Sequence, residues 1–364
     1  MNIAQQLLRK HLRNITPYAS ARRSMSGGRI WLNANESPYS RDYAVNTENL
    51  NRYPNFQSTE LNTAYANFAG VGADQLLSHR GSDESIELLI RSFCEPGQDS
   101  IMICPPTYGM YAISAALNNT PVVSVPLQPS DNPTQRWQLD LEAMQANSAG
   151  VKVLFLCNPS NPLGNLLAPN AIETVLKFFA GQALVVVDEA YIEYALQENP
   201  SLSFASRLQE FDNLVVMRTL SKAFGLAGIR VGFTIANRDI IQALVPILAP
   251  YPLPDVSIQI ANQALRAESL IEMRQNVIEA VAERQRLSTA LRAFEYVERV
   301  EPSSTNFILI QVRDAEALMQ HCVAAGILLR NQSTQVGLAQ SIRITVGAPS
   351  ENDQLLDVLA TFAK

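Results

Sequence analysis

Short apolar runs recur along the first two thirds of the chain, and each is followed by a polar turn and a helical pattern. In residues 75–93, an apolar run precedes a turn at Gly81–Ser82, and apolar residues then return every three to four positions. The scheme is repeated at 99–117, 151–164, 183–194 and 213–225, and a last apolar run covers 230–236. Runs that alternate with helices in this way are typical of a largely parallel sheet covered on both faces.

This alternation of apolar runs and helical patterns ends at a proline-rich stretch, residues 245–257. Beyond it, apolar positions from Met273 to Phe294 recur at a spacing that predicts one long amphipathic helix. Further runs and one helical pattern follow at 305–312, 314–325, 326–330 and 341–347. They predict a second, smaller α/β unit.

We therefore predict an α/β fold in which a large domain, 30–270, has a mainly parallel sheet between helices. A smaller α/β domain is expected at 271–364, and a length of 364 residues favours about two domains. The N-terminal arm, 1–29, is expected to pack on the small domain or on a partner subunit.

Composition excludes several classes of protein. Hydrophobic residues make up 47% of the chain, which is enough for a large core. The net charge of −6 argues against a nucleic-acid surface, which requires a basic excess. We expect neither a membrane span nor a secretory signal, because no apolar run reaches about 18 residues and the N-terminus is polar. The 4 cysteines and 3 histidines are scattered, so we expect no metal site, and reduced thiols in a cytoplasmic protein.

Polar residues follow the predicted strands. In an open parallel sheet, ligands bind outside the carboxyl ends of the strands. The residues at these positions are Gly81, Ser82, Asp83 and Glu84, then Thr107 and Tyr108, Asn158 and Asn161, Asp188 and Tyr191, and Ser221 and Lys222. The pattern thus predicts one shared edge with a glycine turn, a lysine, an aspartate, an asparagine and two tyrosines.

Each feature also has a purely structural interpretation. Ser82 followed by two acids fits an ordinary helix start, and the prolines after Asn158 fit a turn. Asp188 fits a helix cap, although a carboxylate in a dry cleft needs a cationic partner. Tyr108 and Tyr53 fit half-buried aromatics or loop anchors, and Arg230 fits a surface arginine. The functional interpretation therefore depends on the combination.

Together these residues meet the needs of pyridoxal 5′-phosphate (PLP). Its aldehyde needs a lysine amine that is partly deprotonated, and desolvation with a nearby cation would provide this at Lys222. Its ring nitrogen needs a carboxylate, for which Asp188 is the candidate. The remaining predicted contacts are Asn161 and Tyr191 to the ring oxygen, the Ser82–Glu84 helix start with Ser221 and Arg230 to the phosphate, and Tyr108 on the ring face.

With these motifs, the chain resembles the fold-type-I PLP enzymes of the class I/II aminotransferase group, collinearly from 31–38 to 342–347. The order is Tyr108, Asn-Pro-x-Asn-Pro-x-Gly, Asp-x-x-Tyr, Ser-Lys and then an arginine eight residues later. Within this group the chain is most similar to the histidinol-phosphate aminotransferase subfamily. The motifs are "ITPYASARR" (15–23), "LNRYP" (50–54) and "GILLRNQ" (326–332). Leu163 and Ser82 depart from the usual threonine and alanine.

The resemblance implies a homodimer with shared active sites and a reversible ping-pong amino transfer in histidine biosynthesis. Its substrates would be L-histidinol phosphate and 2-oxoglutarate, with imidazole-acetol phosphate and L-glutamate as products. It implies that Lys222 is the catalytic lysine, assisted by Asp188 and Tyr191, and that Tyr53 reaches the cofactor phosphate across the dimer. The implied substrate contacts are Arg343, Arg330, Asn161 and Tyr18.

Other functions remain open at this stage. A broad-specificity aromatic or aspartate aminotransferase, or a decarboxylase of a phosphorylated amino acid, would keep every cofactor residue. A PLP-binding regulatory protein would carry an added DNA-binding segment. A nucleotide-binding protein is disfavoured because residues 80–85 lack the glycine spacing of a phosphate-binding loop.

Overall fold

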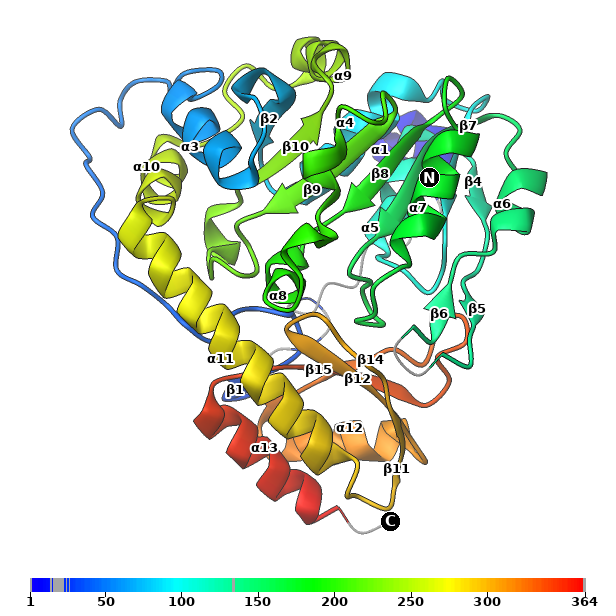
Figure 1. Cartoon of the computed structure of the whole chain (residues 1–364), viewed down its shortest axis with the longest axis vertical. Helices are drawn as coiled ribbons and strands as arrows, with labels where there is room; N and C mark the ends of the chain where they lie inside the picture. The colour runs from blue at the N-terminus through cyan, green and yellow to red at the C-terminus, as the bar shows by residue number, and fades with distance from the viewer. Residues whose placement is uncertain are drawn as a thin grey trace.

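The computed structural model describes residues 2–13, 15, 23, 25, 27–132 and 135–362. A large and a small sheet lie at opposite ends of the molecule, and α11 (Ala267–Leu291) runs alongside both (Figure 1). Because α11 buries Met273 and Val277 with the large sheet and Leu287 and Leu291 with the small one, it holds the two parts together.

The large sheet is mainly parallel. Its strand order is β2 (Leu76–His79), β10 (Gly232–Ala236), β9 (Leu214–Thr219), β8 (Leu184–Asp188), β7 (Val151–Cys157), β3 (Ser100–Ile103) and β4 (Val122–Ser124). Only β10 runs antiparallel to its neighbours, β2 and β9. The predicted α/β class with a mainly parallel sheet between helices is confirmed.

Helices cover both faces of this sheet. Successive strand residues point to opposite sides, so apolar residues in a row are buried on both faces. In β8, Val185 and Val187 pack on one side and Val186 on the other. One side is covered by α4 (Ser82–Phe93), α5 (Met110–Asn118) and α9 (Arg238–Leu244). The other side is covered by α3 (Thr59–Ala69), α6 (Leu141–Ala146), α7 (Pro169–Phe178), α8 (Ile192–Leu196) and α10 (Asp255–Ala264).

The small sheet is antiparallel, in the order β11 (Val297–Val300), β12 (Phe307–Val312), β15 (Ser341–Thr345) and β14 (Arg330–Asn331). Helices α12 (Ala315–Ala324) and α13 (Pro349–Ala360) pack on one face of it. The opposite face carries Phe307 and Leu309, which join the core of the large sheet. Two short pairs, β1 (Ile30–Trp31) with β13 (Ile327–Leu328) and β5 (Gln128–Pro129) with β6 (Trp137–Gln138), complete the strands of the described residues.

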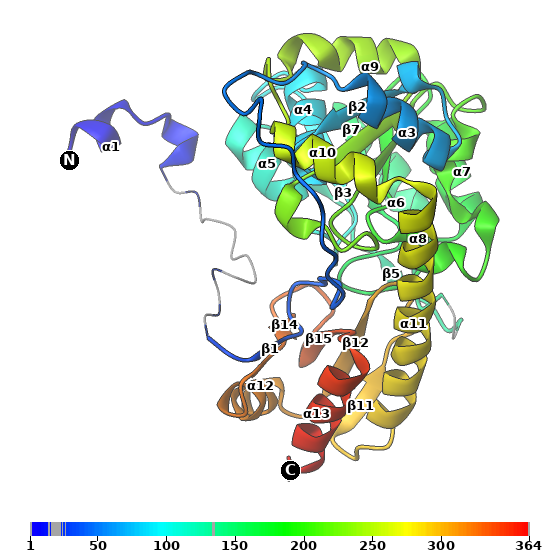
Figure 2. The same ribbon diagram turned by 90° about the vertical axis from the view of Figure 1, so that its left-hand side faces the viewer.

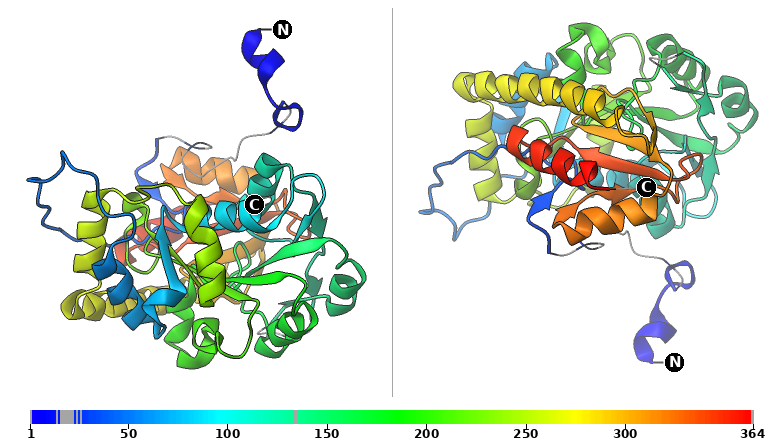
Figure 3. Two further views of the ribbon diagram at one scale, coloured as in Figure 1. Left: turned by 90° about the horizontal axis from the view of Figure 1, so that it is seen from above. Right: turned by 90° about the horizontal axis from the view of Figure 1, so that it is seen from below.

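The domain boundaries stay a prediction, because β1 belongs by position to the large domain but pairs with the small part. The first helix, α1 (Ile3–Leu7), projects from the body (Figures 2 and 3). Just after it, His11 Nε2 lies 3.3 Å from the carbonyl oxygen of Leu117 in α5. Tyr18 lies outside the described residues. In the described ranges, no helix combines the length and apolarity needed to cross a bilayer.

Candidate active site

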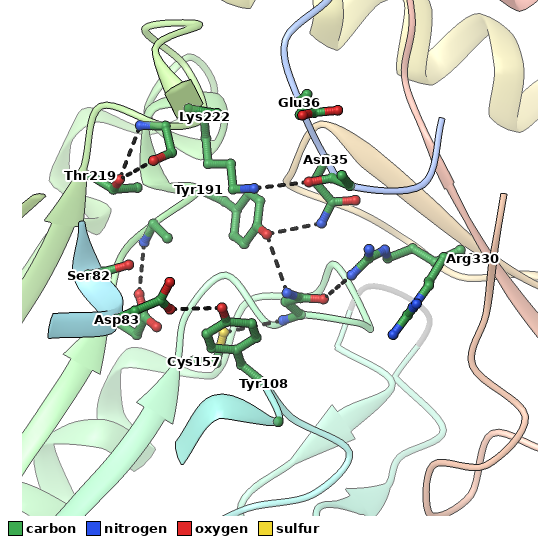
Figure 4. A pocket seen from close by; sticks show the side chains of 18 of the residues that line it. Asn35, Glu36, Ser82, Asp83, Tyr108, Cys157, Tyr191, Thr219, Lys222 and Arg330 are labelled. Atoms are coloured by element: carbon green, nitrogen blue, oxygen red, sulfur yellow. Dashed lines mark hydrogen bonds between the residues drawn. The ribbon is translucent and has the colours of Figure 1, made fainter. Parts of the chain in front are cut away.

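A pocket of about 270 Å³ lies where the carboxyl ends of the parallel strands meet the small sheet (Figure 4). The predicted residues that line it are Ser82, Asp83, Tyr108, Asn161, Asp188, Tyr191, Ser221, Lys222, Arg230, Arg330 and Arg343. Asn161, Ser221 and Lys222 lie in the segments that follow β7 and β9, and Asp188 is the last residue of β8, so the large sheet positions these side chains. The structure therefore brings together eleven residues that are far apart in the chain.

Lys222 follows β9 and extends its amine into the pocket. Its Nζ donates a hydrogen bond of 3.1 Å to the carbonyl oxygen of Ala34 and lies 5.6 Å from the centre of the Tyr191 ring. Burial, and next the positive charge of Arg343, lowers the pKa of Lys222 to about 8. About a tenth of this amine is therefore uncharged at pH 7.

Asp188, the last residue of β8, is buried at the floor of the pocket. The hydroxyl of Tyr111 donates a 2.6 Å hydrogen bond to Oδ2, and the backbone N–H of Ala190 donates to Oδ1 at 3.2 Å. Burial raises the pKa of Asp188 to about 6, and these two donors oppose that shift. In the described part of the chain, no lysine or arginine forms an ion pair with Asp188.

Three polar side chains meet beside the lysine. The Tyr191 hydroxyl accepts a hydrogen bond from Asn35 Nδ2 at 3.0 Å and one from Asn161 Nδ2 at 3.3 Å. Since both partners are donors, the hydroxyl hydrogen of Tyr191 is left to point at an acceptor within the pocket. Asn35 adopts a left-handed backbone, with φ of 54°, and its own N–H donates to the Thr345 hydroxyl.

Arg343, on β15 of the small sheet, closes the other side of the pocket. Its Nη1 donates to Asn161 Oδ1 at 2.5 Å, and its Nη2 donates to the Asn33 carbonyl oxygen at 2.9 Å. The guanidinium lies over the Phe307 ring, 5.3 Å from its centre. Because the Asn161 oxygen accepts from Arg343, the Asn161 nitrogen must be the atom that faces Tyr191. Arg330, on β14, lines the same end.

The start of α4 forms the opposite end of the pocket. Gly81 precedes it with φ of 76°, and a Cβ at this position would lie 2.5 Å from Arg230 Nη2. The first N–H groups of a helix have no acceptor within it, so this end attracts anions. Arg230 also approaches the Ser221 hydroxyl at 3.4 Å and the Asp83 carboxylate at 3.3 Å, while Tyr108 donates to Asp83 at 2.9 Å.

The profile of the family described as "Aminotransferase class I and II" matches residues 29–359. The chain belongs to this family. It is 55% identical to "Histidinol-phosphate aminotransferase 2" of Idiomarina loihiensis over 362 residues, which cover 100% of this chain and 99% of that one. It is 44% identical to "Histidinol-phosphate aminotransferase" of Escherichia coli over 353 residues, 97% of this chain and 96% of that one.

The fold of this aminotransferase family member is also found in solved structures. The histidinol-phosphate aminotransferase of Sinorhizobium meliloti, solved in complex with pyridoxal-5′-phosphate, superimposes with a TM-score of 0.83 at 22% identity. The superposition covers 98% of each chain. The predicted family resemblance is confirmed by the family match and the relatives.

Two predicted residues lie outside the pocket of this aminotransferase. The carboxylate of Glu84 accepts hydrogen bonds from the backbone and guanidinium of Arg80, both at 2.6 Å, and its own N–H donates to the Gly81 carbonyl. The expected contact of Glu84 with the cofactor stays a prediction. Tyr53 is 79% exposed and stacks on Tyr251 with ring centres 4.2 Å apart.

Several further residues that complete the site were not predicted from the sequence. Tyr111 lies three residues after Tyr108, in the first turn of α5, and this close spacing of two tyrosines is a sequence signal that could have pointed to it. Asn35 and Asn33 come from a segment before the first strand of the large sheet, and no local signal places them beside β8 and β15. Thr219 also lines the pocket, and its hydroxyl accepts from the Ser221 backbone N–H at 3.1 Å.

Proposed function

We propose that the chain is a PLP-dependent aminotransferase that exchanges the amino group between L-histidinol phosphate and 2-oxoglutarate in histidine biosynthesis. The observation that carries this proposal is the pairing, in one pocket, of a lysine whose pKa is about 8 with a buried aspartate. The relatives named as histidinol-phosphate aminotransferases, at 44–55% identity over nearly their full lengths, support the choice of substrate.

The residues present fit PLP. A buried carboxylate without an ion-pair partner is unfavourable, and a protonated ring nitrogen at Asp188 would relieve this cost. The hydroxyl hydrogen of Tyr191 and the amide of Asn161 suit an anionic ring oxygen. Ser221, Arg230 and the first N–H groups of α4 suit the phosphate, which would replace Asp83 as the partner of Arg230.

When bound, PLP would supply the aldehyde carbon that receives the substrate amino group. Its ring would withdraw electrons during the transfer. Lys222 would contribute the amine that holds the cofactor, and this amine, once the substrate has replaced it, would move the proton of the substrate α-carbon to the carbon of the cofactor aldehyde. Asp188 keeps the proton on the ring nitrogen, because its buried carboxylate favours a cationic neighbour. Tyr108 provides an aromatic surface beside the ring.

The small-sheet end of the pocket suits an anionic substrate group. Arg343 and Arg330 both line it, and a guanidinium donates paired hydrogen bonds to carboxylate and to phosphate oxygens in the same geometry. We assign Arg343 to the carboxylate of glutamate or 2-oxoglutarate and, with Arg330, to the phosphate of histidinol phosphate. One site would thus serve two substrates of different shape.

We also propose that the protein works as a homodimer in the cytoplasm. Tyr53 and Tyr251 form an exposed aromatic pair outside the pocket of their own subunit, with ring planes 10° apart. An exposed aromatic pair is typical of protein interfaces, and Tyr53 would reach the cofactor phosphate of the partner subunit.

Substrate choice is tested by measuring kcat/KM for L-histidinol phosphate, L-aspartate and L-phenylalanine with 2-oxoglutarate as the acceptor. We expect histidinol phosphate to be preferred by at least about 100-fold, because its phosphate would accept hydrogen bonds from the buried Arg343 and from Arg330. Comparable values for the three amino donors would instead support a broad-specificity aminotransferase of the same family.

A further inference from the structure

A buried histidine lies behind the glycine turn that begins α4. His79 is the last residue of β2 and is fully buried, although Ser82, at the start of α4, lines the pocket. Its Nδ1 lies 3.0 Å from the Gly81 carbonyl oxygen, and its Nε2 lies 2.9 Å from the Thr234 hydroxyl. The ring therefore links the turn to β10.

The direction of each hydrogen bond in this cluster follows from the chemistry of its members. A carbonyl oxygen only accepts, so Nδ1 carries the hydrogen that is donated to Gly81. Burial lowers the pKa of His79 to about 4, so the ring is neutral and Nε2 accepts from Thr234. The Thr234 oxygen then accepts from the Ser85 hydroxyl, 2.5 Å away in the first turn of α4. No hydrogen-bonding atom of the ring is left over.

These hydrogen bonds fix the orientation of the peptide group between Gly81 and Ser82. The Gly81 carbonyl accepts from His79 Nδ1 and from the Glu84 N–H, so it points into the protein. In a trans peptide the N–H points away from the carbonyl, which directs the Ser82 N–H to the other side. Gly232 permits this approach, because a Cβ there would lie 2.6 Å from both Gly81 C and Ser82 N.

We propose that His79 is a positioning residue for the anion-binding end of the pocket: it holds the Gly81 carbonyl so that the N–H groups at the start of α4 face the phosphate of the cofactor. The inference rests on the proposed function, since it takes the phosphate of PLP as the anion. Thr234 and Ser85 act behind His79 by fixing the orientation of its ring.

The test compares two ligands that differ only in the phosphate, PLP and pyridoxal. Dissociation constants are measured for the apo forms of the wild type, His79→Leu, Thr234→Val and His79→Gln. Both ligands bond to Lys222, so their affinity ratio isolates the phosphate. We expect His79→Leu to lower the preference for PLP by about tenfold and Thr234→Val by about threefold, with pyridoxal affinity unchanged. His79→Gln, whose amide can donate and accept, should retain most of the preference.

His321→Leu is the matched control, because His321 also contacts a backbone carbonyl, that of Val358, but in the small part. It should leave the ratio unchanged. Equal weakening of both ligands in His79→Leu and Thr234→Val, or an unchanged ratio in both, would overturn the positioning role. If His79→Leu does not fold, Thr234→Val decides. A wild type that binds pyridoxal as tightly as PLP would instead refute the proposed phosphate site itself.

Discussion

The Tyr111 hydroxyl donates a 2.6 Å hydrogen bond to Asp188 beneath the pocket, and both side chains are buried. The Tyr111 ring is fixed by stacking on Phe155 of β7, with ring centres 4.7 Å apart. The donor stabilises the ionised form of Asp188 and so opposes the effect of burial, which raises the pKa of this carboxyl to about 6 even with the donor in place. Tyr111 thus acts on the carboxylate that we assign to the cofactor.

Replacing Tyr111 with phenylalanine is expected to raise the pKa of Asp188 further. PLP binding to the apo protein should weaken as pH falls through about 6 in the wild type, because the carboxylate becomes neutral. In Tyr111→Phe the midpoint should move to higher pH, and PLP affinity at pH 7 should fall about tenfold. Absorbance titration of the apo protein with PLP at several pH values measures both the midpoint and the affinity. Tyr65→Phe, whose ring stacks on Phe233, is the control, and an unshifted midpoint in Tyr111→Phe would contradict the assignment.

The lowered pKa of Lys222 predicts selective chemistry in the apo protein. The rate at which its amine reacts with an amine-directed reagent should rise with pH and have its midpoint near pH 8. Bound PLP should protect the amine from the reagent. Peptide mass spectrometry at several pH values measures this for each of the lysines. Modification of Lys222 only above pH 10 would refute the shift.

The same pKa has a consequence for stability. Because the folded-state pKa of Lys222 lies below the value of 10.5 for a free lysine, the unfolded chain binds more protons between about pH 8 and 10.5. The charged Lys222 amine therefore lowers the free energy of unfolding by its full amount below pH 8. This destabilisation decreases as pH rises from about 8 to 10.5. Lys222→Met should stabilise the apo protein at pH 7 by up to about 3 kcal/mol and remove this slope. Denaturant unfolding at pH 7 and 10 tests both effects, and equal slopes in the two proteins would contradict the account.

Arg343 is expected to govern the affinity for dicarboxylate substrates. Arg343→Lys keeps the charge but loses the paired donors, so KM for glutamate and 2-oxoglutarate should rise by about 10- to 100-fold. PLP affinity should change less than these KM values, because Arg343 is assigned to the substrate and acts on the assigned cofactor contacts through its hydrogen bond to Asn161. Arg41→Lys, at an outlying ion pair with Glu272, should leave KM unchanged. An unaltered KM in Arg343→Lys would place the carboxylate elsewhere.

The proposed sharing of sites between subunits predicts complementation. Tyr53→Ala and Lys222→Ala should each be nearly inactive as pure dimers. After mixing and subunit exchange, half of the dimers would be mixed and would carry one intact site, which gives about a quarter of the wild-type activity. Mixing two batches of the same variant is the control. No recovery in dimers whose exchange is shown by mass would refute a role for Tyr53 in the partner's site.

The fold and the cofactor end of the site could be predicted from local pattern. Lys222 and Asp188 each follow an apolar run that forms a strand of the large sheet, and ligands gather at this edge of such a sheet. Asn35 and His79 could not be predicted. Asn35 reaches Tyr191 across 156 positions of the chain, and the role of His79 depends on Thr234, 155 positions away. Contacts of this kind are set by packing and leave no periodic signal.

The central claim is that Lys222 catalyses amino transfer from L-histidinol phosphate. The most direct measurement is the formation of L-glutamate from L-histidinol phosphate and 2-oxoglutarate by PLP-loaded wild type and Lys222→Ala, followed together with imidazole-acetol phosphate. We predict equal amounts of the two products with the wild type and a rate at least about 10³-fold lower with the variant. No glutamate with the wild type, or an unchanged rate with Lys222→Ala, would contradict the account.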